Sequence, residues 1–139
     1  MAANMRVRLV QSGPAKFTAT NAAGATGSID GPPDMGGVNA GLRPMETLLS
    51  ALASCSAMDV LLIMKKQRQD LERLDVEVDG ERADAVPAVF TKIHLRFVGY
   101  GPIDLKKLQK AVDLSIKKYC SVSKMLQPKV AITAESVLG

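Results

Sequence analysis

One long, mostly apolar segment limits the possible folds of this chain more than any other feature. The segment METLLSALASCSAMDVLLIMKK spans Met45–Lys66 and contains no glycine or proline. Pro44, directly before it, suits the first turn of a helix, where the missing N–H costs nothing. The sequence therefore predicts a long helix from Pro44 to about Asp70, which ends in the polar run KKQRQD.

The apolar residues of this helix indicate how it is buried. A stripe at helical spacing is formed by Met45, Leu48, Leu49, Leu52, Ser56 and Val60. From Ala57 to Met64 the segment is apolar almost all round, so we expect it to be buried on most sides. A helix of this kind is typical of the centre of a domain.

Short strands precede the long helix. The pieces RVRLV, KFTAT and ATGSI lie between Met5 and Asp30, and the turn signals SGP and NAAG separate them. This pattern predicts a small antiparallel meander. The stretch DGPPDMGGVNAGLRP, residues 30–44, is too rich in glycine and proline for a helix or a regular strand. It predicts a long loop, and long loops in compact domains are often functional.

Further strands and a second helix follow. LDVEVDG and FTKIHLRFV alternate between apolar and polar residues and predict a hairpin, with Ile93, Leu95 and Phe97 on its buried face. PIDLKKLQKAVDLSIKKY predicts a helix capped by Asp104, with an apolar stripe of Leu105, Leu108, Val112, Ile116 and Tyr119. SVSKML predicts a short helical turn and KVAITAESV a last strand. The order of strands and helices predicts one α+β domain over residues 1–139.

Composition argues against several classes of protein. A net charge of +4 without a basic run, and 4% aromatic residues, argue against a nucleic-acid-binding module. The longest apolar run, VLLIM, is too short to span a membrane, and the first residues lack the apolar segment of a signal peptide. We therefore expect a cytoplasmic protein without membrane contact.

The two cysteines, Cys55 and Cys120, lie 65 residues apart. In the cytoplasm thiols stay reduced, so a structural disulfide is not expected. Two cysteines and one distant histidine do not supply the four ligands of a zinc site, so no metal is expected. Composition alone favours small, buried and inert thiols.

Two motifs change this interpretation. RPMETLLSALASCSAMDV carries a Pro-x-Glu, formed by Pro44 and Glu46, with Cys55 nine residues after the glutamate. AVDLSIKKYCSVSKML places Cys120 after a helix and before a Ser-Val-Ser segment. Together, and in this order, they resemble the two cysteine signatures of the OsmC/Ohr family, osmotically inducible protein C and the organic hydroperoxide resistance proteins. The resemblance covers essentially the whole chain.

The resemblance implies a fold and an activity. The fold would be an α+β intertwined homodimer, with two sheets around two long central helices. The activity would be reduction of organic hydroperoxides, in which the Cys55 thiolate becomes a sulfenic acid that Cys120 resolves as a disulfide. If SVSKML is helical, Cys120 lies at its N-terminus, where the helix dipole favours the thiolate. No bound cofactor is implied, only an external dithiol reductant such as dihydrolipoamide.

Glu46 matches the family's glutamate, but its spacing from Cys55 raises a geometric question. On a straight helix, nine residues place the two on opposite sides, roughly 14 Å apart along the axis. Either the helix bends, or Glu46 serves the thiol of a partner subunit. Alternatively, Glu46 only complements the dipole at the start of its helix.

The family also implies a cation that pairs with the glutamate and favours the thiolate. Its best-known members place an arginine upstream for this purpose. Here the only arginines before Glu46 are Arg6 and Arg8, in the first predicted strand, and Arg43. Arg43 could substitute, and a solvated loop arginine is the alternative. Other OsmC-like proteins also lack the upstream arginine.

The remaining candidates concern the substrate. Residues near the motifs that could line an apolar pocket are Met45, Leu48, Met58 and Met125, although methionines at helical spacing are also common in cores. His94 lies on the wet face of its strand and has no expected role. The alternative function is a non-enzymatic small-molecule-binding protein with an apolar pocket at the dimer interface. The missing arginine favours this alternative, whereas the cysteine pair favours the peroxidase.

Overall fold

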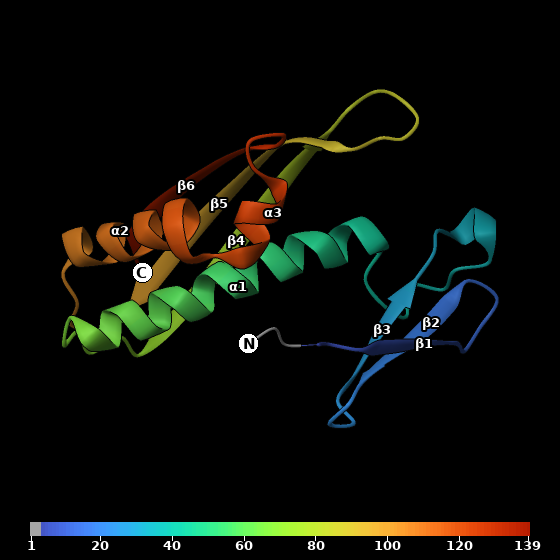
Figure 1. The fold of residues 1–139 in the computed structure, drawn as a ribbon, viewed down its shortest axis with the longest axis horizontal. Coiled ribbons are helices and arrows are strands. Elements are labelled where there is room, and N and C mark those ends of the chain that lie inside the picture. Colours follow the sequence, from blue (N-terminus) through green and yellow to red (C-terminus); the bar gives the residue numbers. More distant parts are fainter. Residues whose placement is uncertain (1–3) are drawn as a thin grey trace. The chain divides into compact units, whose positions relative to one another are not determined.

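The computed structural model describes residues 4–139, so residues 1–3 of the predicted single domain lie outside the described part. Two units are compact in themselves: the residues up to Leu48, and Leu49–Gly139. Figure 1 shows a group of strands in the first unit, and a sheet with helices in the second. The mixture of a meander, a long helix, further strands and a second helix confirms the predicted α+β class.

The first unit contains the predicted antiparallel meander. Its strands are β1 (Val7–Gln11), β2 (Lys16–Asn21) and β3 (Thr26–Asp30), in the order β1-β2-β3. The turn after β2 is closed by the side chain of Asn21, whose Oδ1 accepts hydrogen bonds from two backbone amides of the turn, each at 3.0 Å. Turn chemistry of this kind was readable from the NAAG signal.

The loop after β3 is organised around the buried carboxylate of Asp30. Its oxygens accept hydrogen bonds from the backbone amides of Gly31, Val38 and Ala40, at 2.9, 2.9 and 3.1 Å. The bonds from Val38 and Ala40 contribute most to lowering the pKa of Asp30 below its ordinary value. The predicted loop therefore has a defined shape, with one 3₁₀ turn, η1, at Pro33–Met35.

The sheet of the second unit has the order β4-β5-β6. β4 (Arg73–Arg82) and β5 (Phe90–Tyr100) form the predicted hairpin, and β6 (Ala131–Leu138) runs parallel to β5. Parallel neighbours need a crossover connection, which the helical segment between β5 and β6 supplies. The alternation in β5 is confirmed, because Ile93, Leu95 and Phe97 are buried.

The long helix α1 spans Pro44–Lys66. It ends earlier than the predicted Asp70, because the chain turns at Arg68, which has a φ of 57°. Figure 1 shows α1 and α2 (Leu105–Leu114) on the same side of the second unit's sheet. The side chains of α1 that are buried are Leu52, Ala53, Ser56, Val60 and Met64.

Within the single chain, the burial predicted on most sides of the segment 57–64 is not found. Met58, Leu61 and Leu62 are 68%, 51% and 54% exposed. Over residues 4–139, the buried side chains of α1 lie on one side of the helix. Composition showed that the whole segment is apolar, but not how many faces have a neighbour.

The length of α1 also corrects the argument from the run VLLIM. α1 is long enough to cross a bilayer, and an 18-residue window within it has a mean hydropathy of 1.8, which is apolar enough to do so. Central helices of globular domains meet the same criterion of length and composition. In this chain α1 buries five side chains, at positions 52, 53, 56, 60 and 64.

The second helical region has three parts. Asp104 caps α2 as predicted, since its Oδ1 accepts a hydrogen bond from the Lys106 amide at 2.9 Å. A π-helical turn, η2 (Ser115–Tyr119), follows, and then the predicted short helix α3 (Ser121–Leu126). The wider π turn changes which residues face the core, so Ser115 is buried and Tyr119 is 52% exposed. The prediction that Tyr119 belongs to the apolar stripe is therefore wrong.

Candidate functional site

The two cysteines lie together in the second unit. Cys55 is a half-buried residue of α1, and Cys120 is fully buried at the N-cap of α3. Both thiols are free, and Cys55 is a side-chain hydrogen-bond partner of Cys120. The fold thus brings into contact two thiols that are 65 residues apart in the sequence.

Backbone hydrogen bonds fix the position of Cys120. Its amide donates to the Ser115 carbonyl at 2.7 Å, which joins it to the start of the π turn. Its sulfur accepts from the Ser123 amide at 3.4 Å, and its carbonyl accepts from the Lys124 amide at 3.1 Å. The Ser123 hydroxyl in turn donates to the Ile116 carbonyl at 2.9 Å. Cys120 is therefore held from both the preceding turn and the following helix.

The environment of Cys120 favours the thiol. Burial raises the pKa of Cys120 to about 11; the hydrogen bond from the Ser123 amide lowers it, and the neighbouring Cys55 raises it further. The amide donors at the start of α3 favour the thiolate, as expected, but the loss of solvent outweighs them. At neutral pH Cys120 keeps its proton and can donate it toward Cys55.

Glu46 lies in the first turn of α1, in the first unit. Its Oε1 accepts a hydrogen bond from the Arg43 amide at 2.8 Å. This bond satisfies an amide that precedes the helix, as in a capping box, and places a negative charge at the positive end of the helix. The structure thus gives Glu46 a role at the helix start, and whether it also serves a thiol stays a prediction.

The Arg43 guanidinium contacts the loop of the first unit. Nη1 donates to the Gly31 carbonyl at 2.7 Å, and Nη2 donates to Oδ1 of Asn39 at 3.5 Å. These bonds, and its electrostatic effect on Asp30, tie Arg43 to the loop. Its predicted role as the activating cation stays a prediction.

The four predicted substrate residues differ in exposure. Met45 and Leu48 are half-buried in the first turns of α1. Met58 and Met125, in the second unit, are 68% and 84% exposed. Their role in binding stays a prediction.

A cavity of about 440 Å³ lies between α1 and the end of α2 and has a different lining. The lining residues are Asp59, Leu62, Ile63, Lys66, Leu114 and Tyr119. Three of them follow Cys55 by four, seven and eleven residues, so they share its face of α1. Sequence reasoning missed this cavity, although the helical spacing from Cys55 could have indicated its α1 side.

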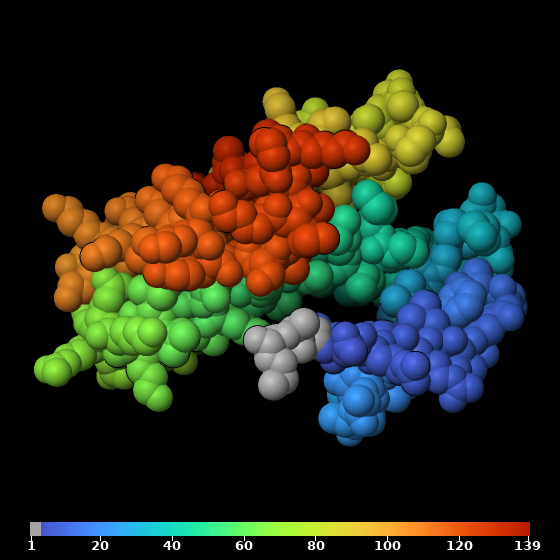
Figure 2. Space-filling view, viewed as in Figure 1, coloured from blue at the N-terminus to red at the C-terminus, as the bar shows by residue number. Residues whose placement is uncertain are grey.

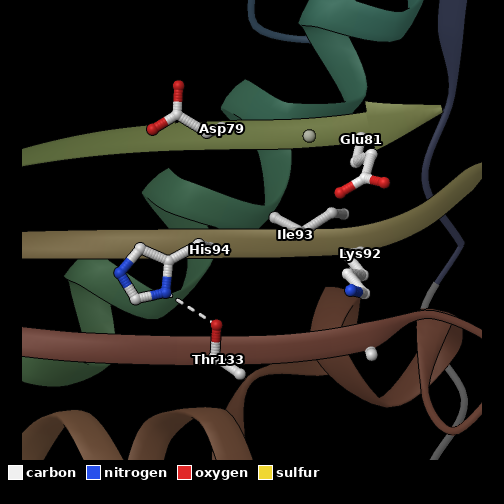
Figure 3. Close-up of a pocket in the computed structure, with 8 residues that line it drawn as sticks. Asp79, Glu81, Lys92, Ile93, His94 and Thr133 are labelled. Atoms are coloured by element: carbon white, nitrogen blue, oxygen red, sulfur yellow. Dashed lines mark hydrogen bonds between the residues drawn. The ribbon is translucent and has the colours of Figure 1, made fainter.

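A second cavity, of about 540 Å³, lies on the polar face of the sheet, beside residues of β4, β5 and β6 (Figure 3). In it, Nδ1 of His94 is 2.6 Å from Oγ1 of Thr133. Nε2 of His94 is 3.2 Å from Oε1 of Glu135. The histidine expected to be simply solvated is therefore half-exposed and hydrogen-bonded. Over residues 4–139, no group of three or more His, Cys, Asp or Glu side chains is placed to hold a metal ion.

Comparison with known proteins identifies a family and relatives that this chain resembles. The family model described as OsmC-like protein matches residues 36–135. Protein YhfA of Escherichia coli (strain K12) is 47% identical over 92 residues, which cover 65% of this chain and 68% of YhfA.

Two solved structures show the same fold. A hypothetical protein from Aquifex aeolicus VF5 is 31% identical, with a TM-score of 0.84 and 99% of both chains covered. The organic hydroperoxide resistance protein OhrB of Bacillus subtilis is 20% identical, with a TM-score of 0.65 and coverage of 97% of this chain and 98% of OhrB. By the family match and the similarity to YhfA, this chain belongs to the OsmC-like protein family.

Proposed function

We propose that this protein is a thiol-dependent peroxidase that reduces organic hydroperoxides. In the first step the Cys55 thiolate attacks the terminal oxygen of the hydroperoxide, and the O–O bond breaks. The terminal OH passes to sulfur, which gives a Cys55 sulfenic acid. The other oxygen leaves as an alkoxide that takes up a proton and becomes the alcohol.

In the second step Cys120 attacks the Cys55 sulfur. The S–O bond breaks, hydroxide leaves as water with the proton of the Cys120 thiol, and a disulfide forms. An external dithiol such as dihydrolipoamide then reduces this disulfide and becomes a disulfide itself. The net reaction consumes one hydroperoxide and one dithiol, and it produces one alcohol and one water.

The observation that carries this proposal is the contact between Cys55 and Cys120 inside the second unit. Cys55 is partly exposed and Cys120 is fully buried, which suits an attacking thiol and a resolving thiol respectively. Cys55 has access to solvent, as an attacking thiol needs. Cys120 is shielded and protonated, so it is protected from direct oxidation until Cys55 has reacted.

The proposal includes a homodimer in the cytoplasm. Several large apolar side chains are exposed in this chain, among them Met58, Leu61 and Leu62 on α1 and Leu9 on β1. Apolar surface of this extent is typical of an interaction site, and a second copy of the chain is the partner that the family resemblance implies. In such a dimer, Glu46 of one subunit could serve the Cys55 of the other.

A mass spectrum under non-reducing conditions tests the function. Reduced protein is mixed with one molar equivalent of cumene hydroperoxide, and a parallel sample receives hydrogen peroxide. We expect a loss of two hydrogens that maps to a Cys55–Cys120 bond, formed faster with the organic oxidant. In Cys120→Ser the same treatment should stop at a Cys55 sulfenic acid that dimedone traps. Two unmodified thiols in the wild-type protein would contradict the proposal.

The cavity beside α1 favours a second candidate, a non-enzymatic binding protein for a small apolar molecule. Its lining combines apolar side chains with Asp59 and Lys66, in the manner of many ligand sites. Equilibrium binding of an apolar fluorescent probe, compared between wild type and Leu62→Trp, tests it. Displacement from the cavity by a redox-inert apolar alcohol, together with inert thiols, would favour binding over catalysis.

A further inference from the structure

Ser115 connects the segment that carries Cys120 to the helix that carries Cys55. It is fully buried at the junction of α2 and η2. Its hydroxyl lies 3.0 Å from Oδ2 of Asp59 and 3.1 Å from the Ser56 carbonyl, both on α1. One hydroxyl proton is therefore shared between two acceptors that come from a helix 56 to 59 residues away in the sequence.

These bonds complete a closed ring around the two thiols. Asp59 follows Cys55 by one helical turn, so the two residues share a face of α1. From Asp59 the ring passes to the Ser115 hydroxyl, and from the Ser115 carbonyl to the Cys120 amide at 2.7 Å. The contact between Cys120 and Cys55 closes it.

The π turn η2 links the position of Cys120 directly to that of Ser115. The bond from the Cys120 amide to the Ser115 carbonyl spans five residues, as a π-helical bond does. The position of Cys120 therefore follows the position of Ser115. A turn of this kind is rare and tends to occur at functional sites. Figure 2 shows α2, η2 and α3 in orange and red, packed along the green part of α1.

Burial of the serine hydroxyl does not require Asp59. A single acceptor satisfies a hydroxyl donor, and the Ser56 carbonyl is already within reach. The Asp59 carboxylate is a second acceptor at 3.0 Å, and hydrogen bonds to a charged acceptor are stronger than those to a neutral one. The Ser115–Asp59 bond is therefore not needed to satisfy the buried hydroxyl, and it restrains Ser115 against α1 in addition.

We propose that Asp59 and Ser115 are a positioning pair that holds Cys120 against Cys55 for disulfide formation. This role rests on the thiol chemistry of the proposed function, but it does not depend on the oxidant. By restraining Cys120, the pair raises the effective concentration of its thiol at the Cys55 sulfur. The two side chains bind each other, and the Ser115 carbonyl binds the Cys120 amide, so both residues act through Cys120.

Equilibration with glutathione tests the pair without any peroxide. The protein dithiol and one oxidised glutathione give the protein disulfide and two reduced glutathione molecules, so electrons and protons balance. The fraction of disulfide at a series of glutathione ratios, read by mass spectrometry after acid quenching, gives the equilibrium constant. This constant measures the effective concentration directly.

The variants are Ser115→Ala, Asp59→Asn and the double variant. Ser115→Ala keeps the backbone carbonyl that binds the Cys120 amide and removes only the tie to α1. We expect it to lower the equilibrium constant for disulfide formation five- to tenfold. This corresponds to a reduction potential of the Cys55–Cys120 disulfide that is about 20 to 30 mV less negative. Asp59→Asn keeps an acceptor but loses its charge, so its effect should be smaller. The double variant should match Ser115→Ala, because both changes break the same bond.

Matched controls come from the same helices. Ser54→Ala removes an exposed hydroxyl whose bonds stay within α1, at 2.7 Å to the Ser50 carbonyl. Asp113→Asn removes an exposed carboxylate of α2. Both controls should leave the glutathione constant within twofold of wild type.

The outcomes separate the positioning pair from the peroxidase. If Ser115→Ala and Asp59→Asn both have the glutathione equilibrium constant of the wild type, the positioning role is rejected, even if cumene hydroperoxide oxidises Cys55. If the constants fall as expected while cumene hydroperoxide leaves both thiols intact, the pair stands and the peroxidase fails. If Ser115→Ala does not fold, Asp59→Asn and Asp59→Ala give the answer, because Asp59 is only half-buried.

Discussion

Strands β1 and β5 both contain apolar residues at alternating positions, but their surroundings differ. Every residue of β1 is exposed, including Val7 at 59% and Leu9 at 53%. In β5, Leu95 and Phe97 are fully buried beneath the helices of the second unit. The comparison teaches that alternation identifies the apolar face of a strand, but not what covers that face.

The interactions that stabilise the first unit internally also differ from those that stabilise the second. In the first, polar side chains organise the backbone: Asn21 closes a turn, Asp30 binds three loop amides, and Arg43 binds the Gly31 carbonyl. In the second, a core of aliphatic side chains and Phe97 lies between the sheet and the helices. We expect acid to loosen the loop of the first unit, and changes in side-chain volume to destabilise the second.

The largest effect is expected for Phe97→Ala. This change removes a fully buried ring from β5 and should lower the free energy of unfolding by about 3 to 5 kcal/mol. Urea denaturation followed by circular dichroism measures it. A loss below about 1 kcal/mol would mean that the second unit is not held by its core.

A smaller effect is expected from the Cys120 thiol at alkaline pH. Its pKa is about 11 in the folded protein, above the 9.0 of a free thiol. The raised pKa contributes stability that is fully present below about pH 8.5 to 9 and is lost as the pH rises toward 11. The loss should be on the order of 2 kcal/mol.

Urea midpoints of reduced wild type and Cys120→Ala, measured from pH 8 to pH 11, test this prediction. The other titrating groups are common to both proteins, so the difference between the two curves isolates Cys120. Parallel curves over the whole range would show that burial does not hold the proton on this thiol.

A local effect is expected at Asp30 in acid. Its lowered pKa means that the ionised carboxylate stabilises the loop above the pKa of the unfolded chain, about 3.9. This contribution disappears as the pH falls through the still lower folded pKa. Hydrogen exchange at the Val38 and Ala40 amides, corrected for the intrinsic rate, should therefore accelerate in acid. In Asp30→Asn the corrected exchange should already be fast at neutral pH and should change little with acidification.

The smallest effect on the free energy of unfolding is expected for Leu9→Ser in β1. Because Leu9 is exposed in this chain, the change should alter the stability of dilute protein by no more than about 0.5 kcal/mol. If a second copy covers β1 as proposed, the same change should weaken self-association, measured by sedimentation velocity. Unchanged association would remove β1 from the interface. Thr26→Ala, an exposed change on β3, serves as the control.

Much of the local structure followed from the sequence. The periodicity of 3.6 in the segment after Pro44 identified α1, and the alternation in the segment around Leu95 identified β5. Asp104 was recognisable as a cap, since a short acceptor side chain before an amphipathic run binds the free amides of a helix. The two cysteine motifs indicated the family that the family model then matched.

Tertiary structure decided what depends on neighbours distant in sequence. The π turn places Ser115 inward and Tyr119 outward, which the regular spacing of α2 did not predict. β6 pairs parallel to β5, and burial keeps the proton on Cys120 despite its place at a helix start. The sequence by itself determined the local elements, because hydrogen bonding and side-chain spacing act over a few residues. The ring through Asp59, Ser115, Cys120 and Cys55 needed the folded chain, because its contacts join α1 to a turn more than 50 residues away.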